Sequence, residues 1–439
     1  MIPLAVSEVA ALGLGRLQAA PGAEDLAGVQ ADSRRIGPGD LFVAVGGGTA
    51  FVDDARRRGA AATLVPNDPF AALGALARLV RARSSARVVA ITGSMGKTST
   101  KDLLAALIRP HARLVAAERS YNNEVGVPLT LCRLEPDTEI LISELAMRAP
   151  GQIAELAALV RPDVGVITNV LPVHLEKLGS LEAIARAKAE LLAALPSGGT
   201  AIVPAGVAAL EPYLGRPDVS VIRVGAGGDA WVVEVETTGE RSRCAFDVGG
   251  RSVELELGFT QRHQAENALT ALVAYDVLGL PLGEAQRGAG EIAFSLLRGE
   301  ELPLPGGGVL INDCWNANPV SMRAAFEHLA VRAGGRRRVA VLGDMAELGP
   351  AAPALHVEVG EEAAAAGIEA LLAIGPLAQG YLEGAGGIPA ARWAATLDEG
   401  LAALADFLRP GDAVLVKGAR AMGLEAVADM LTAAHASTQ

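Results

Sequence analysis

The chain has 439 residues, enough for about three domains that each bury a core of their own. Its formal net charge of −12, without any basic block, argues against nucleic acid as a partner. No apolar stretch of about 18 residues is free of charges and turn formers, so we expect no membrane insertion. The N-terminus lacks the basic start and apolar core of a signal peptide. Three widely spaced cysteines (Cys132, Cys244 and Cys314), not at metal-ligand spacing, favour a reduced, cytoplasmic setting.

The first segment, residues 1–83, is predicted to be a small α/β domain. Asp32, Ser33 and Arg34 precede a Pro-Gly-Asp turn and an apolar strand at 41–45. A helix at 53–59, a strand at 62–65 and a longer helix at 69–83 follow. Two serines then lead into the next segment.

The most informative stretch is residues 87–104, RVVAITGSMGKTSTKDLL, where an apolar strand meets a glycine-rich turn and then a helix. The turn and the first helical turn consist of Gly93, Ser94, Met95, Gly96, Lys97, Thr98 and Ser99. Backbone N–H groups, the helix N-terminus and the Lys97 ammonium together attract phosphate. Thr98 supplies a hydroxyl that can ligate a phosphate-bound Mg²⁺. The pattern TGSxGKT is a shorter variant of the P-loop, because Ile91 stands where the longer pattern has glycine, and it predicts a nucleoside triphosphate site.

Alternation of strands and helices predicts an α/β fold of three domains. The second segment, 84–296, is expected to form a parallel sheet covered on both faces, with alternating valines at 219–258 adding antiparallel strands. The third segment, 297–439, is expected to form a smaller Rossmann-like sheet. The strands predicted for these two sheets are 88–92, 139–144, 164–169 and 200–203, then 309–312, 338–343, 371–374 and 413–416.

Three ionisable side chains are candidates for the same site. Glu144 ends a predicted strand, and the carboxyl ends of parallel strands face the ligand crevice, although an exposed strand-end Glu is the alternative. His174 follows the next strand on the same edge, where a lone histidine is as often structural. Lys188 interrupts the inward apolar stripe of a helix at 181–195, and lysines are seldom buried without a purpose. Snorkelling along that stripe would also explain Lys188.

Two amide-rich segments complete the candidates. Asn267 lies in the first turn of an Ala-rich helix and could donate and accept at a purine edge. The segment DCWNANPVS, 313–321, follows a strand of the third domain and offers side chains to whatever lies between the domains. Helix capping by Asn318 or Ser321 is the simpler alternative.

Motifs along almost the whole chain resemble those of the Mur ligase family, the ATP-dependent amide-forming enzymes that build the peptidoglycan stem peptide. They are DSRRIGPGDLFVA (32–44), ITGSMGKTSTKDL (91–103), YNNEVGVPLTLCRL (121–134), HLEKLGSLEAIARAKAEL (174–191), NDCWNANPVSM (312–322), LGDMAELG (342–349) and VKGAR (416–420). Within the family, YNNEVGVPLTL, NANP and GDMAELG indicate the branch that adds D-alanyl-D-alanine to UDP-N-acetylmuramoyl-tripeptide.

The resemblance implies a UDP-sugar-binding domain (1–83), an ATP-binding domain (84–296) and a domain that closes over the incoming amine (297–439). It implies that ATP converts the tripeptide carboxylate into an acyl phosphate, which the amine of the dipeptide then attacks. We expect a cytoplasmic monomer that uses two Mg²⁺ ions.

Residue roles follow from the same resemblance. For the metal ions, the resemblance assigns Lys97 and Thr98 to phosphate and Mg²⁺, Glu144 to the same ion, and His174 and a carbamylated Lys188 to the second ion. For the nucleotide, it assigns Asn267 to adenine, and Arg298 and Asp313 to triphosphate and ribose. For the other substrates, it assigns Ser33 and Arg34 to the uridine diphosphate, Asn122 and Asn123 to the sugar-peptide channel, and Asn316, Asn318 and Ser321 to the dipeptide.

Some positions depart from the family pattern. A loop after the first strand is shortened to GGGTAFVDD, which puts part of the UDP contact in doubt. Trp315 replaces the usual Tyr, Gln264 an Asn and Ala419 a Ser, and none of these changes removes a group that the chemistry requires.

Other hypotheses are a ligase that adds diaminopimelate or lysine, a folylpolyglutamate synthetase, and a nucleotide-dependent scaffold without catalysis. NANP and YNNEVGVPLTL argue against the first two. Intact Lys97, Glu144, His174 and Lys188 argue against the scaffold. Diaminopimelate, lysine and ornithine stay open as the third residue of the stem peptide.

Overall fold

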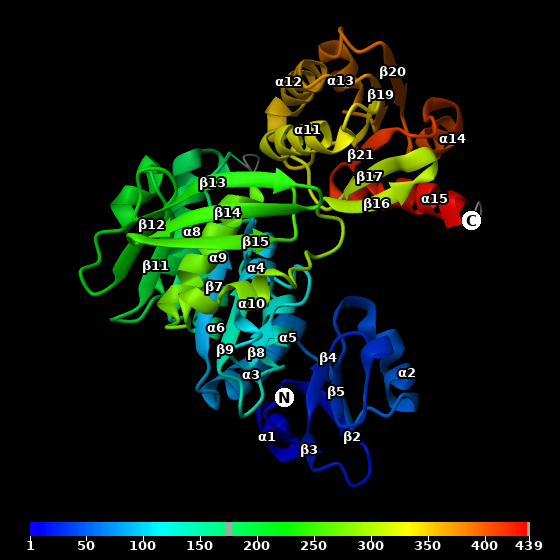
Figure 1. The fold of residues 1–439 in the computed structure, drawn as a ribbon. Coiled ribbons are helices and arrows are strands. Elements are labelled where there is room, and N and C mark those ends of the chain that lie inside the picture. Colours follow the sequence, from blue (N-terminus) through cyan, green and yellow to red (C-terminus); the bar gives the residue numbers. More distant parts are fainter. Residues whose placement is uncertain (173–177, 437–439) are drawn as a thin grey trace.

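The structure, a computed structural model, describes residues 1–172 and 178–436, and for residues 434–436 it describes the backbone alone. Three main β-sheets follow one another along the chain and form three lobes (Figure 1). The expected α/β fold class is confirmed. Among the described residues, no helix has the length and apolar character needed to cross a membrane.

The N-terminal lobe contains a four-stranded sheet in the order β2-β6-β5-β4. Its strands β4, β5 and β6 are parallel, and β2 runs antiparallel to β6. A short antiparallel pair, β1 with β3, lies beside it. The elements are β1 (Leu4–Ala5), α1 (Val6–Ala11), β2 (Gly15–Ala19), β3 (Asp25–Leu26), β4 (Gly28–Gln30), β5 (Asp40–Val43), α2 (Val52–Arg57), β6 (Ala62–Pro66) and α3 (Pro69–Ala82).

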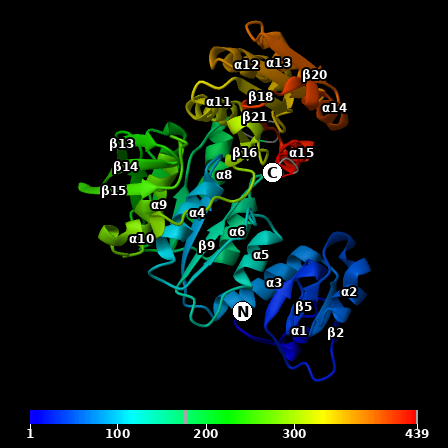
Figure 2. The same ribbon diagram turned by 45° about the vertical axis from the view of Figure 1, so that its right-hand side comes forward.

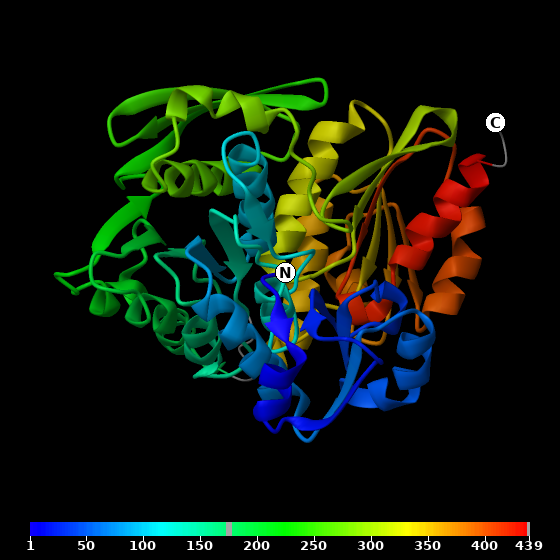
Figure 3. The same ribbon diagram turned by 90° about the horizontal axis from the view of Figure 1, so that it is seen from below.

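Helix α3 joins the N-terminal lobe to the central lobe. Asp68 caps it by accepting hydrogen bonds from the N–H groups of Phe70 and Ala71, and Pro69 occupies its first position, where no N–H is needed. Its apolar face, which includes Leu73 and Leu76, belongs to one continuous core that extends from the N-terminal sheet to one face of the central sheet. The two lobes are therefore packed together through α3 (Figure 3).

The central lobe is built on a nine-stranded sheet in the order β15-β14-β13-β12-β11-β10-β7-β9-β8. Strands β7 to β12 are parallel, whereas β13, β14 and β15 form an antiparallel meander, as the alternating valines predict. The strands are β7 (Arg87–Thr92), β8 (Leu114–Ala116), β9 (Ile140–Glu144), β10 (Val164–Ile167), β11 (Thr200–Pro204), β12 (Ser220–Val224), β13 (Ala230–Thr238), β14 (Arg241–Val248) and β15 (Arg251–Leu257).

Helices cover both faces of the central sheet, which explains why its inner strands are apolar without interruption. Along β7, Val88 and Ala90 face the core shared with α3, whereas Val89 and Ile91 face the opposite core. The helices of the lobe are α5 (Gly126–Leu131), α6 (Gln152–Val160) and α8 (Leu181–Ala193) on the first face, and α4 (Lys97–Ile108), α9 (Gln264–Val277) and α10 (Gln286–Ala289) on the second.

The C-terminal lobe holds a six-stranded sheet in the order β16-β17-β21-β18-β19-β20, parallel except for β16. Figure 2 shows this lobe beside the central one, with α11 near the junction. The elements are β16 (Glu300–Leu304), β17 (Gly308–Asp313), α11 (Pro319–Ala333), β18 (Arg338–Gly343), α12 (Ala352–Ala365), β19 (Ala370–Ile374), α13 (Gln379–Gly384), β20 (Ala390–Ala394), α14 (Leu397–Phe407), β21 (Ala413–Lys417) and α15 (Glu425–Ala436).

Apolar runs in the sequence predict the four inner strands of this sheet, but β16 and β20 were not predicted. Both lie at the edges of the sheet. Their side chains are mostly partly or fully exposed, so they lack the continuous apolar run that marks an inner strand.

Candidate active site

The glycine turn between β7 and α4 has a backbone that other residues could not adopt without strain. Gly93 and Gly96 have φ angles of +153° and +77°. A Cβ atom at Gly93 would lie 1.9 Å from Thr168 Oγ1, and one at Gly96 would lie 2.3 Å from Asn267 Oδ1. The two glycines therefore let neighbouring strands and α9 approach the loop closely, as a phosphate cradle requires.

Lys97 begins α4 and folds back over this loop. Its Nζ donates hydrogen bonds to the carbonyl oxygens of Gly93 at 2.8 Å and Ser94 at 3.4 Å. Burial lowers the pKa of Lys97, although the Glu144 carboxylate opposes this shift. The ammonium is thus held against the backbone of the loop.

Polar side chains after β10 support the other side of the loop, a contribution that the sequence hypothesis did not assign. Thr168 Oγ1 donates to the Met95 carbonyl at 2.5 Å, and Asn169 Oδ1 accepts from the Met95 N–H at 2.8 Å. Ser94 Oγ donates to the Leu171 carbonyl at 3.0 Å. The available signal was their position at the carboxyl end of a neighbouring parallel strand.

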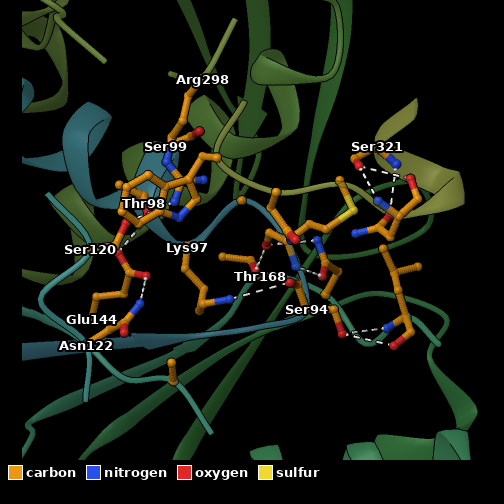
Figure 4. Close-up of a pocket in the computed structure, with 18 of the residues that line it drawn as sticks. Ser94, Lys97, Thr98, Ser99, Ser120, Asn122, Glu144, Thr168, Arg298 and Ser321 are labelled. Carbon is orange, nitrogen blue, oxygen red and sulfur yellow. Dashed lines mark hydrogen bonds between the residues drawn. The ribbon is translucent and has the colours of Figure 1, made fainter. Parts of the chain in front are cut away.

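Glu144 lies beside the phosphate loop, because β9 pairs with β7 and brings Glu144 level with Ile91. Thr98 Oγ1 donates to Glu144 Oε2 at 2.8 Å, and Asn122 Nδ2 donates to Glu144 Oε1 at 2.7 Å. Ser120 Oγ lies 3.3 Å from Thr98 Oγ1. In Figure 4 these groups gather on one side of Lys97, with Ser94 on the other.

Oxygen ligands of this kind suit Mg²⁺, which binds through one or two carboxylates and completes its shell with phosphate and water. The part of the chain that the structure describes has no cluster of three or more His, Cys, Asp or Glu side chains able to hold a metal. A Mg²⁺ ion at Thr98 and Glu144 would therefore depend on nucleotide phosphates for its other ligands.

Lys188 is buried in α8, with only 2% of its surface exposed, as its place on the apolar stripe predicts. Burial lowers the pKa of Lys188 well below the usual range, and the Lys97 ammonium lowers it further. The alternative that Lys188 snorkels to solvent does not hold. His174, its predicted partner, lies outside the described residues.

A cavity of about 1120 Å³ opens between the central and C-terminal lobes. Most of the predicted residues line it. They are Ser94, Met95, Gly96, Lys97, Thr98, Ser99, Asn122, Asn123, Glu144, Asn267, Arg298, Asp313, Asn316, Asn318 and Ser321. Gly93 and Lys188 are not among the residues that line the cavity.

Ser33 and Arg34, predicted to bind the uridine diphosphate, are in the N-terminal lobe and do not line this cavity. Ser33 Oγ donates to Asp54 Oδ2 at 2.8 Å, and Arg34 pairs with Asp32 at 2.7 Å. The two residues are thus engaged within their own lobe.

The C-terminal lobe contributes a partly buried ion pair to the cavity. β17 and β21 are parallel neighbours that bring Asp313 level with Lys417, and the Lys417 Nζ lies 2.5 Å from Asp313 Oδ2. Lys417 Nζ also donates to the Asn316 carbonyl at 2.8 Å. Lys417 belongs to the VKGAR motif, but no role was predicted for this lysine from the motif.

Arg298 lies just after the connection between the lobes and spans the cavity. Its Nη2 donates to Ser120 Oγ at 2.9 Å, and its guanidinium carbon lies 5.4 Å from the centre of the Trp315 ring. Among the described residues, its Nε has no hydrogen-bond partner although it is buried. A guanidinium with a free donor in a cavity is suited to an anionic ligand.

The amide side chains play a local structural part as well as lining the cavity. Asn318 caps α11, and Ser321 completes the capping box with two 3.0 Å hydrogen bonds. Asn123 Oδ1 accepts from the Gly126 N–H at 2.9 Å. Asn318 Nδ2 is buried without a hydrogen-bond partner in the described part of the chain, so it retains a donor for a ligand.

Asn267 is in the first turn of α9, next to Gly96. Its Nδ2 donates to Gln264 Oε1 at 2.7 Å, and its Oδ1 accepts a long hydrogen bond of 3.4 Å from Thr100 Oγ1. The side chain is therefore at the phosphate loop and also at the wall of the cavity.

The Mur ligase middle domain matches residues 91–275, and the Mur ligase, glutamate ligase domain matches residues 298–420. The UDP-N-acetylmuramoyl-tripeptide–D-alanyl-D-alanine ligase of Mycobacterium tuberculosis is 37% identical, over 92% of each chain. The chain belongs to the Mur ligase family. It is therefore an ATP-dependent ligase, as the resemblance implies, and the use of ATP agrees with the nucleotide site predicted from the phosphate loop.

Solved Mur ligase structures share the architecture. MurF from Acinetobacter baumannii has a TM-score of 0.85 at 26% identity, over 98% of both chains. MurF from Thermotoga maritima in complex with ADP has a TM-score of 0.78 at 26% identity, over 92% of this chain and 96% of that one. Folylpolyglutamate synthase of Mycobacterium tuberculosis, one of the alternatives above, shares only the fold, with a TM-score of 0.64 at 17% identity.

Proposed function

We propose that this Mur ligase uses ATP to join D-alanyl-D-alanine to UDP-N-acetylmuramoyl-tripeptide in peptidoglycan precursor synthesis. One observation carries the proposal: the phosphate loop and the NANP segment, from two different lobes, line the same cavity. Relatives from Mycobacterium tuberculosis and Escherichia coli with 37% and 34% identity are named for this reaction. The cavity is large enough for a nucleotide and part of a second substrate.

The residues present fit ATP and Mg²⁺. Side chains larger than glycine at 93 and 96 would collide with Thr168 and Asn267 and distort the phosphate loop, and Arg298 Nε is a buried donor without a partner among the described residues. Thr98 and Glu144 would hold one Mg²⁺ ion, and carbamylated Lys188 with His174 would hold the second. Bound Mg²⁺ would offset the charge of a carboxylate approaching a triphosphate.

The side chains of this enzyme position the reactants and stabilise charge. Lys97 holds the phosphate that is transferred, so that the tripeptide carboxylate can become an acyl phosphate. Arg298 would meet the same phosphates from the C-terminal side, with Asp313 near the ribose and Asn267 near adenine. The C-terminal lobe keeps water away from the acyl phosphate until the dipeptide amine attacks it.

The two organic substrates would approach from opposite sides of the nucleotide. Asn122 and Asn123 would line the channel for the sugar-peptide, whose uridine diphosphate end would reach Ser33 and Arg34. Asn316, Asn318 and Ser321 would face the dipeptide. This division corresponds to domains at 1–83, 84–296 and 297–439.

The enzyme would act as a cytoplasmic monomer. The three cysteines are all buried and free, as expected of a chain kept in a reducing compartment.

The test of the function is the release of ADP as a function of both substrates. We expect sustained, multiple-turnover release of ADP only when a UDP-N-acetylmuramoyl-tripeptide and D-alanyl-D-alanine are both present. Tripeptides ending in diaminopimelate, lysine or ornithine would identify the third residue of the stem peptide. ADP release with free lysine, diaminopimelate or glutamate in place of the dipeptide would instead support one of the alternative ligases.

Closure of the C-terminal lobe on ligand binding is a second expectation. Arg298 and Asp313 follow the connection between the lobes, whereas Lys97 belongs to the central lobe that precedes it. A nucleotide that contacts all three residues would therefore draw the lobes together. Small-angle scattering should show a smaller radius of gyration with an ATP analogue and the tripeptide substrate than without ligands. An unchanged radius would contradict the closure.

A further inference from the structure

Two adjacent charged residues on α4 have contacts that the reaction outlined above does not use. Lys101 and Asp102 follow Lys97 by about one helical turn. The Lys101 ammonium and the Asp102 carboxylate form an ion pair with Nζ to Oδ1 at 2.8 Å, and 3% and 11% of their side chains are exposed. A buried pair of this kind needs further hydrogen bonds to offset the loss of hydration.

Lys101 obtains those bonds from the segment that leads to Ser120. Its Nζ donates to the carbonyl oxygens of Ala117 at 2.8 Å and Arg119 at 2.9 Å. Arg119 has a φ angle of +49°, in the left-handed region that is unfavourable for a residue other than glycine. Lys101 therefore holds a strained backbone immediately before Ser120.

Asp102 holds the connection between the central and C-terminal lobes. Its Oδ2 accepts hydrogen bonds from the Ser295 N–H at 2.8 Å and the Ser295 hydroxyl at 2.9 Å. Leu297, two residues later, has a φ angle of +64°, and its carbonyl accepts from the Trp315 N–H at 3.2 Å. The connection is thus held by one lobe at Ser295 and by the other at Leu297.

The two anchored segments meet at one hydrogen bond. Arg298 Nη2 donates to Ser120 Oγ at 2.9 Å, and Ser120 Oγ lies 3.3 Å from Thr98 Oγ1. In the described part of the chain, Arg298 Nε has no partner that would orient the guanidinium by itself. The orientation of the Arg298 side chain therefore depends on the position of its own backbone, which follows the Ser295–Leu297 connection.

We propose that Lys101 and Asp102 are positioning residues, which hold the Ser120 segment and the Ser295–Leu297 connection so that Arg298 reaches the Thr98 side of the phosphate loop. The same α4 helix begins with the phosphate-binding residues. It therefore sets the distance between Lys97 and Arg298, two cations of the cavity that come from separate parts of the chain. This inference rests on the proposed function only for its kinetic readout.

The kinetic test compares Asp102→Ala, Asp102→Asn and Ser295→Ala, each alone and combined with Arg298→Ala. We expect Asp102→Ala to lower kcat by about 10- to 100-fold, the range for a misplaced reactive group, with a smaller change in KM for ATP. Asp102→Asn keeps an acceptor for Ser295 and should restore most of the activity. With Arg298→Ala already present, Asp102→Ala should lower kcat less than about 2-fold, because the two act through one guanidinium.

A matched control removes another backbone-anchoring carboxylate of the same lobe. Asp163 Oδ2 accepts from the Val88 N–H at 2.8 Å, outside the cavity lining. Asp163→Ala should change the melting temperature but leave kcat within about 2-fold. An equal loss of kcat from Asp102→Ala with and without Arg298 would show a merely structural role and overturn the proposal.

A fluorescence test needs no turnover and separates this inference from the proposed function. The guanidinium carbons of Arg298 and Arg420 lie 5.4 and 6.0 Å from the centre of the Trp315 ring, so Trp315 emission in a Trp231→Phe, Trp393→Phe, Arg420→Ala background reports the position of the Arg298 guanidinium. Asp102→Ala should shift that emission toward the value for Arg298→Ala.

Unshifted emission would overturn the positioning role even if the wild-type enzyme is fully active, whereas a wild-type enzyme without ADP release would overturn only the proposed function. Should Asp102→Ala fail to fold, Ser295→Ala, which removes one of the two bonds, should show the same shift to a smaller extent.

Discussion

Replacing Lys97 by alanine is expected to abolish the release of ADP and to leave the protein folded. Lys97 is the lysine whose Nζ closes the phosphate loop, 2.8 Å from the Gly93 carbonyl. Loss of one preorganised contact to the transferred phosphate typically lowers kcat by about 100- to 1000-fold, or about 3–4 kcal/mol. The steady-state rate of ADP release, with the melting temperature as a check of folding, measures this effect.

The control for Lys97→Ala removes a positive charge from the other end of the same helix. Arg109 is exposed and follows the last turn of α4. Arg109→Ala should keep the wild-type rate, because it is about one helix length from the loop. Near-normal turnover of Lys97→Ala would contradict the assignment of the nucleotide site.

Lys188→Ala is expected to lose activity although ATP still binds. The reason is the proposed carbamate on Lys188, which would ligate the second Mg²⁺ together with His174. Carbamate formation needs a neutral amine, and an ordinary lysine is almost wholly protonated at neutral pH. Burial, with the Lys97 ammonium nearby, lowers the pKa of Lys188 and so raises the fraction of neutral amine.

Bicarbonate provides the direct measurement. Adding it to CO₂-depleted enzyme should raise the rate of ADP release, and the increase should be absent in Lys188→Arg, which keeps a positive charge but cannot form the carbamate. Arg186→Ala is the matched control, because it removes an exposed charge from the same helix and should respond to bicarbonate as the wild type does. Full activity of Lys188→Ala or Lys188→Arg would end the carbamate hypothesis.

Several parts of the site were predictable because they depend on neighbours in the chain. Strand, glycine turn and helix follow one another within residues 87–104, so their order alone indicated a phosphate cradle. The burial of Lys188 was equally local, since a helical period of about 3.6 residues places it among leucines and isoleucines. Glu144 was predictable from its place at the end of a strand, because parallel strands present their carboxyl ends together.

The contacts between distant segments could not be predicted in this way. Asp102 and Ser295 are 193 positions apart, Ser120 and Arg298 are 178 apart, and Asp313 and Lys417 are 104 apart. No periodicity relates such pairs, and the side chains look like ordinary polar residues in their own segments. Their partners are decided by which strands pair and how the lobes pack.

The amino-acid sequence by itself thus determined the three α/β units, the phosphate loop and the inward place of Lys188, because short-range spacing and apolar patterning specify these features. The tertiary structure alone decided that Arg298 meets Ser120, that Lys417 neutralises Asp313, and that the edge strands β16 and β20 complete the last sheet. Those features depend on hydrogen bonds and ion pairs that form only when segments far apart in the chain are buried together.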